Sequence, residues 1–186
     1  MTETVYSVGL IVGSASENSL NRRYAEALRQ LAPDAGLELT DIPISQLPFY
    51  GTQYDRAYPE VGVELKRAID GADGLLMVTP EYNRSIPGVL KNAIDWATRP
   101  GGKSSLAGVP TAVTGASKGA VSTAVAQAHL KSILSALGVP LVGAPEAYIR
   151  VDDDFFADDG SFAREGTREF LTGYLRALHD LIGRWR

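Results

Sequence analysis

Apolar and polar positions along the chain predict an alternation of strands and helices. Short unbroken apolar runs are typical of strands buried on both faces of a parallel sheet, and the stretches between them carry apolar residues at helical spacing. The predicted strands are 5–12, 37–42, 75–78, 109–113 and 141–149. The predicted helices are 20–31, 63–69, 87–98, 121–137 and 164–185. This order predicts right-handed crossovers and a doubly wound parallel α/β sheet in a single domain, residues 1–186.

A loop bounded by prolines follows the third predicted strand. Pro80 has a fixed φ and no N–H, so the chain leaves the sheet rigidly, and Pro87 suits the first position of the next helix. The loop therefore lies at the carboxyl end of a central strand, where open α/β sheets bind ligands. Its backbone groups and the Asn83 amide can bond the edge of a ring that carries both donors and acceptors.

The loop after the first predicted strand, residues 13–21, is rich in serine and asparagine. Its hydroxyls and free backbone N–H groups gather at the positive end of a helix, which suits a single phosphate group. Serine and asparagine are also the usual N-cap residues, so on these letters alone a purely structural role is the more common one.

The run from Thr79 to Trp96 reads T-P-E-Y-N-R-S-I-P-G-V-L-K-N-A-I-D-W. It closely resembles the T-P-E-Y-N-x-S-x-P-G-x-L-K-N-A-I-D-W signature of the NADPH-dependent FMN reductases, and every fixed letter is present. That family belongs to the flavodoxin-like superfamily and includes bacterial quinone, chromate and azo-dye reductases. The resemblance implies a five-stranded flavodoxin-like sheet of order 2-1-3-4-5 in a three-layer αβα arrangement, with FMN as cofactor and NADPH or NADH as electron donor.

The resemblance implies that three loops contact FMN. The family's G-S-x-R-x-x-S-x-N pattern is met in the first loop except that Ser16 stands at the arginine position. Losing that charge-assisted hydrogen bond is expected to weaken FMN binding by roughly ten- to a hundredfold, or to change the choice between NADPH and NADH. The implied cofactor-binding residues are Ser14, Ser16, Ser19, Leu20, Asn21, Pro80, Glu81, Tyr82, Asn83, Gly115, Ser117, Lys118 and Gly119.

The implied chemistry belongs to the flavin, and no protein side chain is expected to be catalytic. Hydride transfer from the nicotinamide, followed by reduction of an acceptor in the same slot, gives a ping-pong cycle. The expected acceptor is a quinone, an azo compound, chromate or free flavin. Tyr50 and Tyr54, in the long connection after the second predicted strand, are expected to wall the open face of the flavin. The resemblance also implies a homodimer or homotetramer.

Two other functions are weighed against this interpretation. A flavodoxin-like electron carrier has the same fold but little turnover with NAD(P)H. Residues 115–119 also spell G-x-S-x-G, the nucleophile elbow of serine hydrolases, with Ser117 as the nucleophile. The downstream Asp152 and His179 follow the hydrolase order, but His179 falls inside a predicted helix, which disfavours a catalytic base.

Composition excludes several further classes. The 22 acidic and 18 basic residues give a net charge of −4 without a basic cluster, so nucleic acid is not an expected partner. With no cysteine and two distant histidines, neither a disulfide nor a metal site is expected. The sequence shows no basic leader and no apolar run long enough to span a membrane, so a cytoplasmic protein is expected.

Overall fold

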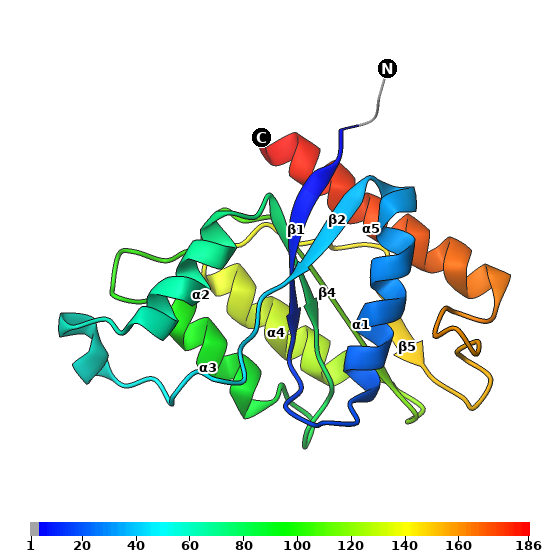
Figure 1. Cartoon of the computed structure of the whole chain (residues 1–186), viewed down its shortest axis with the longest axis horizontal. Helices are drawn as coiled ribbons and strands as arrows, with labels where there is room; N and C mark the ends of the chain where they lie inside the picture. Colours follow the sequence, from blue (N-terminus) through cyan, green and yellow to red (C-terminus); the bar gives the residue numbers. More distant parts are fainter. Residues whose placement is uncertain (1–3) are drawn as a thin grey trace.

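The computed structural model describes residues 4–186 and contains a five-stranded parallel sheet of order β2-β1-β3-β4-β5 (Figure 1). The predicted strand order is therefore confirmed. The strands are β1 (Tyr6–Val12), β2 (Leu37–Asp41), β3 (Gly74–Val78), β4 (Thr111–Ser117) and β5 (Tyr148–Arg150).

Helices cover both faces of the sheet, and the side-chain alternation of the strands explains how. On β1, Val8, Leu10 and Val12 pack with α1 and α5, whereas Ile11 packs on the opposite face with α2, α3 and α4. The expected three-layer arrangement is confirmed. The helices are α1 (Leu20–Leu31), α2 (Glu60–Asp70), α3 (Gly88–Ala97), α4 (Ala124–Ala136) and α5 (Glu165–Trp185), with short 3₁₀ turns η1 (Ala32–Ala35) and η2 (Thr52–Arg56).

Two predicted strands have the wrong limits. β4 does not end at residue 113 but continues to Ser117, because residues 115–117 pair with β5. The predicted strand 141–149 is reduced to β5, and Leu141 makes only an isolated bridge to Thr111. Pro145 lacks the N–H that a continuous ladder would require, which helps to keep the segment before β5 irregular.

Helix starts also differ from the predicted ones. Pro87 has an extended ψ of 145° and precedes α3 as its N-cap, so it is not the first helical residue. Ser122 has a φ of 51°, which a helix cannot contain, and α4 accordingly begins at Ala124 and not at 121. α2 begins at Glu60, directly after the extended Pro59, and not at 63.

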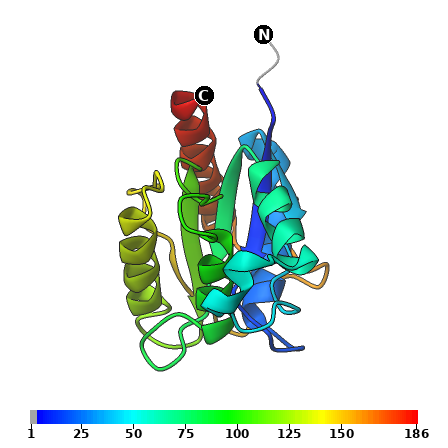
Figure 2. The same ribbon diagram turned by 90° about the vertical axis from the view of Figure 1, so that its left-hand side faces the viewer.

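The carboxyl ends of the strands meet at the lower edge of the sheet in Figure 1. β1 begins and α5 ends at the opposite end of the molecule (Figures 1 and 2). The loops that follow β1, β3 and β4 leave from three adjacent strands, so they lie together at the carboxyl edge, where this class of sheet binds its ligands. No helix within residues 4–186 is long and apolar enough to cross a membrane.

Candidate functional site

The loop between β1 and α1 has the donors that an anion requires. The Ser19 hydroxyl caps α1 by accepting the Arg22 N–H at 3.1 Å, and the buried Ser14 hydroxyl accepts the Ser16 N–H at 3.4 Å. The backbone N–H groups of Glu17 and Leu20 have no acceptor within residues 4–186. Free N–H groups at a helix start form a positive anion site, so this loop is compatible with the expected phosphate contact.

Asn21 has a structural role that the sequence alone did not indicate. Its Nδ2 donates to the Ala116 carbonyl at 2.9 Å, and its Oδ1 accepts the Ala116 N–H at 2.8 Å. Both groups are buried, so this side chain holds the loop after β1 against the end of β4. The residues lie 95 positions apart, which explains why a local sequence pattern could not reveal the contact.

The loop after β3 is a tight turn with an exposed tip. Tyr82 and Ser85 exchange both of their backbone hydrogen bonds at 3.0 Å, while Asn83 and Arg84 have positive φ values of 50° and 65°. This is the geometry of a type I′ turn, for which asparagine is well suited. The turn leaves Tyr82 (47% exposed) and Asn83 facing solvent, where they are free to contact a ligand.

Glu81 fixes this turn to the next helix. Its Oε2 accepts the backbone N–H groups of Val125 and Ala126, both at 3.1 Å, so the carboxylate caps α4, whose N-cap residue Thr123 makes no side-chain capping bond. Ser85 Oγ lies 3.1 Å from Nδ1 of His129 on the same helix. The Glu81 carboxylate is therefore occupied by hydrogen bonds within the protein. The flavin contact expected of Glu81 is then assigned to its backbone groups.

The end of β4 lies directly behind the turn. A Cβ at position 115 would overlap the Thr79 carbonyl oxygen, so only glycine fits there, and Gly115 contacts protein at this point. The Ser117 hydroxyl accepts the Gly119 N–H at 3.1 Å. Lys118 forms an exposed ion pair with Asp153 at 3.2 Å, an interaction weak enough for the ammonium group to be shared with a ligand.

The predicted triad of a serine hydrolase is not formed. Ser117 lies at the carboxyl end of β4, whereas His179 Nε2 lies 2.9 Å from the Thr4 carbonyl oxygen and its ring packs on Tyr6, where β1 begins. These are opposite ends of a parallel sheet, so the two side chains cannot exchange a proton. The hydrolase hypothesis for Ser117 and His179 is therefore wrong.

Tyr50 and Tyr54 lie around Trp96 of α3. Their ring centroids are 5.4 and 5.0 Å from that of the fully buried Trp96, and the Tyr50 N–H donates to Asn92 Oδ1 at 2.8 Å. Pro48 accepts hydrogen bonds from the Trp96 indole at 2.7 Å and the Asn92 amide at 3.0 Å. Both tyrosines are half-buried in this contact, and their proposed position over the flavin stays a prediction.

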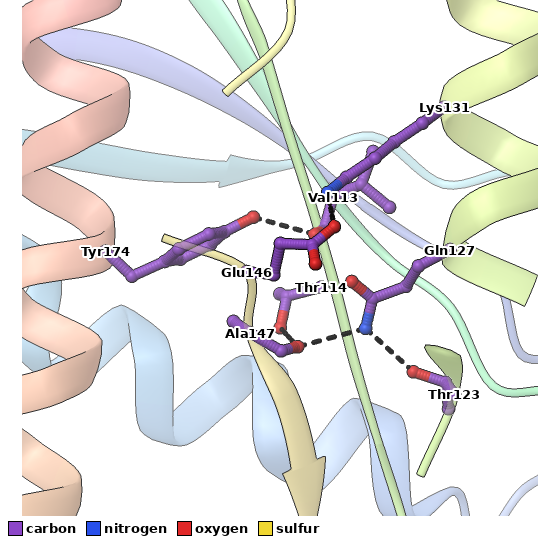
Figure 3. A network of polar contacts seen from close by, with 8 residues as sticks. All are labelled: Val113, Thr114, Thr123, Gln127, Lys131, Glu146, Ala147 and Tyr174. Carbon is purple, nitrogen blue, oxygen red and sulfur yellow. Dashed lines mark hydrogen bonds and ion pairs between the residues drawn. The ribbon is translucent and has the colours of Figure 1, made fainter. Parts of the chain in front are cut away.

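A buried polar network connects α4 with β4 and with the segment before β5 (Figure 3). Gln127 Nε2 donates to Thr123 Oγ1 at 2.9 Å and to the Ala147 carbonyl at 3.0 Å, and Thr114 Oγ1 donates to the same carbonyl at 3.0 Å. The network connects α4, β4 and the segment that enters β5, and it lies next to the helix end that Glu81 caps. Sequence reasoning did not identify it, because serine, threonine and glutamine carry no pattern that distinguishes buried from exposed positions.

The donor set of the three loops fits FMN. The unpaired N–H groups and serine hydroxyls after β1 suit its phosphate, and the exposed turn at Asn83 together with the backbone after Ser117 suits the edge of its ring. Within residues 4–186, no group of three His, Cys, Asp or Glu side chains is placed to bind a metal ion.

Comparison with known proteins agrees with this geometry. A family model described as NADPH-dependent FMN reductase matches residues 6–154. The chain is 45% identical to a 2-hydroxy-1,4-benzoquinone reductase of a Burkholderia species over 169 residues, covering 90% of this chain and 91% of the relative. It is 41% identical to a quinone reductase of Pseudomonas putida over 172 residues, covering 92% and 91%.

Among solved structures, the flavoenzyme NAD(P)H:(acceptor) oxidoreductase FerB from Paracoccus denitrificans superposes with a TM-score of 0.92 at 43% identity. That comparison covers 97% of this chain and 98% of the other. Fold, loop geometry and sequence relationship all lead to one assignment: the chain belongs to the NADPH-dependent FMN reductase family, whose members are flavin-dependent oxidoreductases.

Proposed function

We propose that this protein transfers electrons from NAD(P)H through FMN to a quinone-type acceptor. The observation that carries the proposal is the exposed turn at Tyr82 and Asn83, which the Glu81 carboxylate and the Ser85 hydroxyl fix at the start of α4. A flat ring can lie against this turn while the free N–H groups after β1 hold a phosphate. Relatives named as quinone reductases support the choice of acceptor.

FMN supplies the hydride chemistry when it is bound, and the chain supplies position and charge. The backbone donors and acceptors of the turn would bond the ring edge, and the Glu81 carboxylate holds the turn because it is bonded twice to α4. The exposed Lys118 ammonium and the N–H groups after β4 are placed to stabilise negative charge on the ring. A proton relay is not needed for hydride transfer, which agrees with the absence of a Ser117–His179 pair.

We propose a ping-pong cycle in which the oxidised nicotinamide leaves before the acceptor enters the same slot. Steady-state rates at several fixed quinone concentrations are then expected to give parallel double-reciprocal lines. Intersecting lines would show a ternary complex and contradict this order of binding.

A first experiment combines visible absorption with anaerobic reduction. The purified protein is expected to retain or bind FMN, to lose the yellow absorption on addition of NADPH or NADH, and to regain it when benzoquinone is added. Reduction by NAD(P)H that is too slow to sustain turnover would favour an electron carrier instead. If FMN neither copurifies nor binds on titration, the proposal fails.

The tyrosines of the long connection can be tested separately. Tyr50→Ala or Tyr54→Ala is expected to raise KM for the quinone if either ring walls the flavin. Because both rings also pack on Trp96, Tyr58→Ala is a matched control that disturbs the same cluster from its third tyrosine. An equal effect in all three variants would assign these residues to loop packing alone.

We further propose that the protein forms a homodimer at the edge that carries the site. Two large apolar side chains near the loops are exposed, Phe49 (86%) and Val121 (53%), in addition to Tyr82. Light scattering coupled to size exclusion is expected to give twice the chain mass of 19.9 kDa. A monomer at micromolar concentration would contradict the proposal. A tetramer would mean that a second interface exists besides the proposed one. A cytoplasmic location stays a prediction.

A further inference from the structure

A hollow of about 460 Å³ lies beside the phosphate loop, on the side away from the flavin turn. It is formed by residues at the end of β1, at the start of α1 and in the segment that follows β2. Its lining includes Ser14, Arg22, Asp41 and residues 42–45, and none of the lining residues comes from the loops after β3 or β4. The hollow therefore adjoins the expected FMN phosphate without being the site of the ring, and its volume is in the range of small-molecule sites.

Arg22 brings a free positive charge to this hollow. Its backbone N–H is bonded to Ser19, but its guanidinium makes no hydrogen bond or ion pair within residues 4–186. The next residue differs, because the Arg23 guanidinium lies 4.3 Å from the centroid of the Phe156 ring. A guanidinium is suited to bidentate phosphate binding, and Arg22 remains available for it.

The acidic residue of the hollow does not cancel this charge. Asp41, the last residue of β2, pairs with Arg29 at 2.8 Å, and Arg29 also pairs with Glu26 at 3.1 Å, so the Asp41 carboxylate is engaged by an arginine other than Arg22. A guanidinium beside a hollow of this size suits the 2′-phosphate of an adenosine, because it binds phosphate oxygens in a bidentate manner. The buried side chains of Ile42 and Ile44 and the exposed Pro43 give the hollow an apolar wall on which a flat base can pack.

We propose that this hollow receives the adenosine end of the electron donor and that Arg22 binds its 2′-phosphate, which makes Arg22 the residue that selects NADPH over NADH. The inference rests on the proposed function, since it assumes that NAD(P)H is the donor.

The test uses FMN-loaded protein and two fragments that differ by one phosphate, 2′,5′-ADP and 5′-AMP. Bound FMN keeps the fragments away from the cofactor's own phosphate site. By calorimetry, the wild type is expected to bind 2′,5′-ADP more tightly than 5′-AMP by roughly ten- to a hundredfold, the usual value of a charged phosphate contact. Arg22→Ala is expected to remove the difference and Arg22→Lys to keep part of it, while Arg23→Ala, which removes the same charge one residue away, preserves it.

Steady-state kinetics provide a second readout. The ratio of kcat/KM for NADPH to kcat/KM for NADH is expected to fall in Arg22→Ala by the same factor as the preference for 2′,5′-ADP over 5′-AMP. Equal binding of the two fragments by the wild type would overturn the proposal, and so would an equal loss in Arg23→Ala, which would indicate a diffuse charge effect. If Arg22→Ala instead weakens FMN binding and leaves the fragment preference intact, Arg22 belongs to the cofactor. Failure to bind any flavin would reject the proposed function and this inference with it, whereas FMN-loaded protein that turns over but binds the two fragments equally would reject the role of Arg22 alone.

Discussion

At the scale of single residues, the candidate site depends on polar side chains that bond to distant backbone. Asn21 is the clearest case, because one amide satisfies both the N–H and the carbonyl of Ala116 in a buried position. A free hydroxyl or amide in the same place could contact a ligand, but the oxygen and nitrogen of this amide are both hydrogen-bonded to Ala116. The proposed phosphate contact is therefore assigned to the loop backbone and to Ser14 and Ser16, which stays a prediction.

Asn21→Ala is expected to lower the free energy of unfolding by about 2–4 kcal/mol, because two hydrogen bonds are lost and two buried backbone groups lose their partner. Urea denaturation measures this change. Asn18→Ala, at an exposed position of the same loop, is the control and is expected to change stability by less than about 0.5 kcal/mol. If both variants unfold at the same urea concentration, the Asn21 amide does not hold the two loops together.

At the scale of elements, the turn after β3 and the helix α4 stabilise each other through Glu81. Glu81→Ala is expected to cost about 1–2 kcal/mol, the usual loss on removing a helix cap, and Glu81→Gln to cost less because an amide oxygen still accepts one of the bonds. Thermal unfolding followed by circular dichroism measures both. Equal stability of Glu81→Ala and the wild type would mean that the carboxylate is replaced by water without loss.

The connection between β2 and α2 is fixed to α3 by a small number of contacts. Asn92→Ala removes the acceptor of the Tyr50 N–H and a donor to Pro48, while the Trp96 indole contact to Pro48 remains. We expect amides of residues 46–56 to exchange with deuterated water at least roughly tenfold faster, since the two hydrogen bonds that are lost are worth about 1 kcal/mol each and local opening becomes easier. Exchange in β1 is the internal reference, and uniform acceleration of both segments would indicate global destabilisation instead.

The sequence predicted elements well and contacts between elements poorly, for a physical reason. Buried parallel strands give apolar runs such as Leu75–Val78, which are visible without any partner. The limits of β4 depend on pairing with β5, and the Glu81 cap depends on a helix 44 residues away, so neither is encoded locally. The turn at Asn83 was located because proline and a family signature mark it, whereas the Gln127 network has no such mark.

At the scale of the whole molecule, two buried tyrosines connect the helix layer formed by α1 and α5 to the sheet. The Tyr24 hydroxyl of α1 lies 3.0 Å from Thr114 Oγ1, and the Tyr174 hydroxyl of α5 donates to the Val113 carbonyl at 2.7 Å. Burial raises the pKa of both phenols well above the ordinary value of 10.0. The folded protein therefore keeps these protons at a pH where the unfolded chain releases them.

This linkage predicts a specific alkaline instability. Below about pH 10 both states hold the phenolic protons and stability is unaffected, but above it the unfolded state loses them first, so each tyrosine lowers the free energy of unfolding by up to about 1.4 kcal/mol per pH unit. At pH 8, where only a hydrogen bond is lost, Tyr24→Phe is expected to lower the free energy of unfolding by about 1 kcal/mol. Near pH 11 the variant is expected to be no less stable than the wild type. Urea unfolding at intervals between these pH values measures the pH at which the two stabilities cross. A constant difference between Tyr24→Phe and the wild type across that range would mean that the Tyr24 proton is not retained by the fold, and that the packing of α1 on β4 is looser than the buried hydroxyl pair indicates.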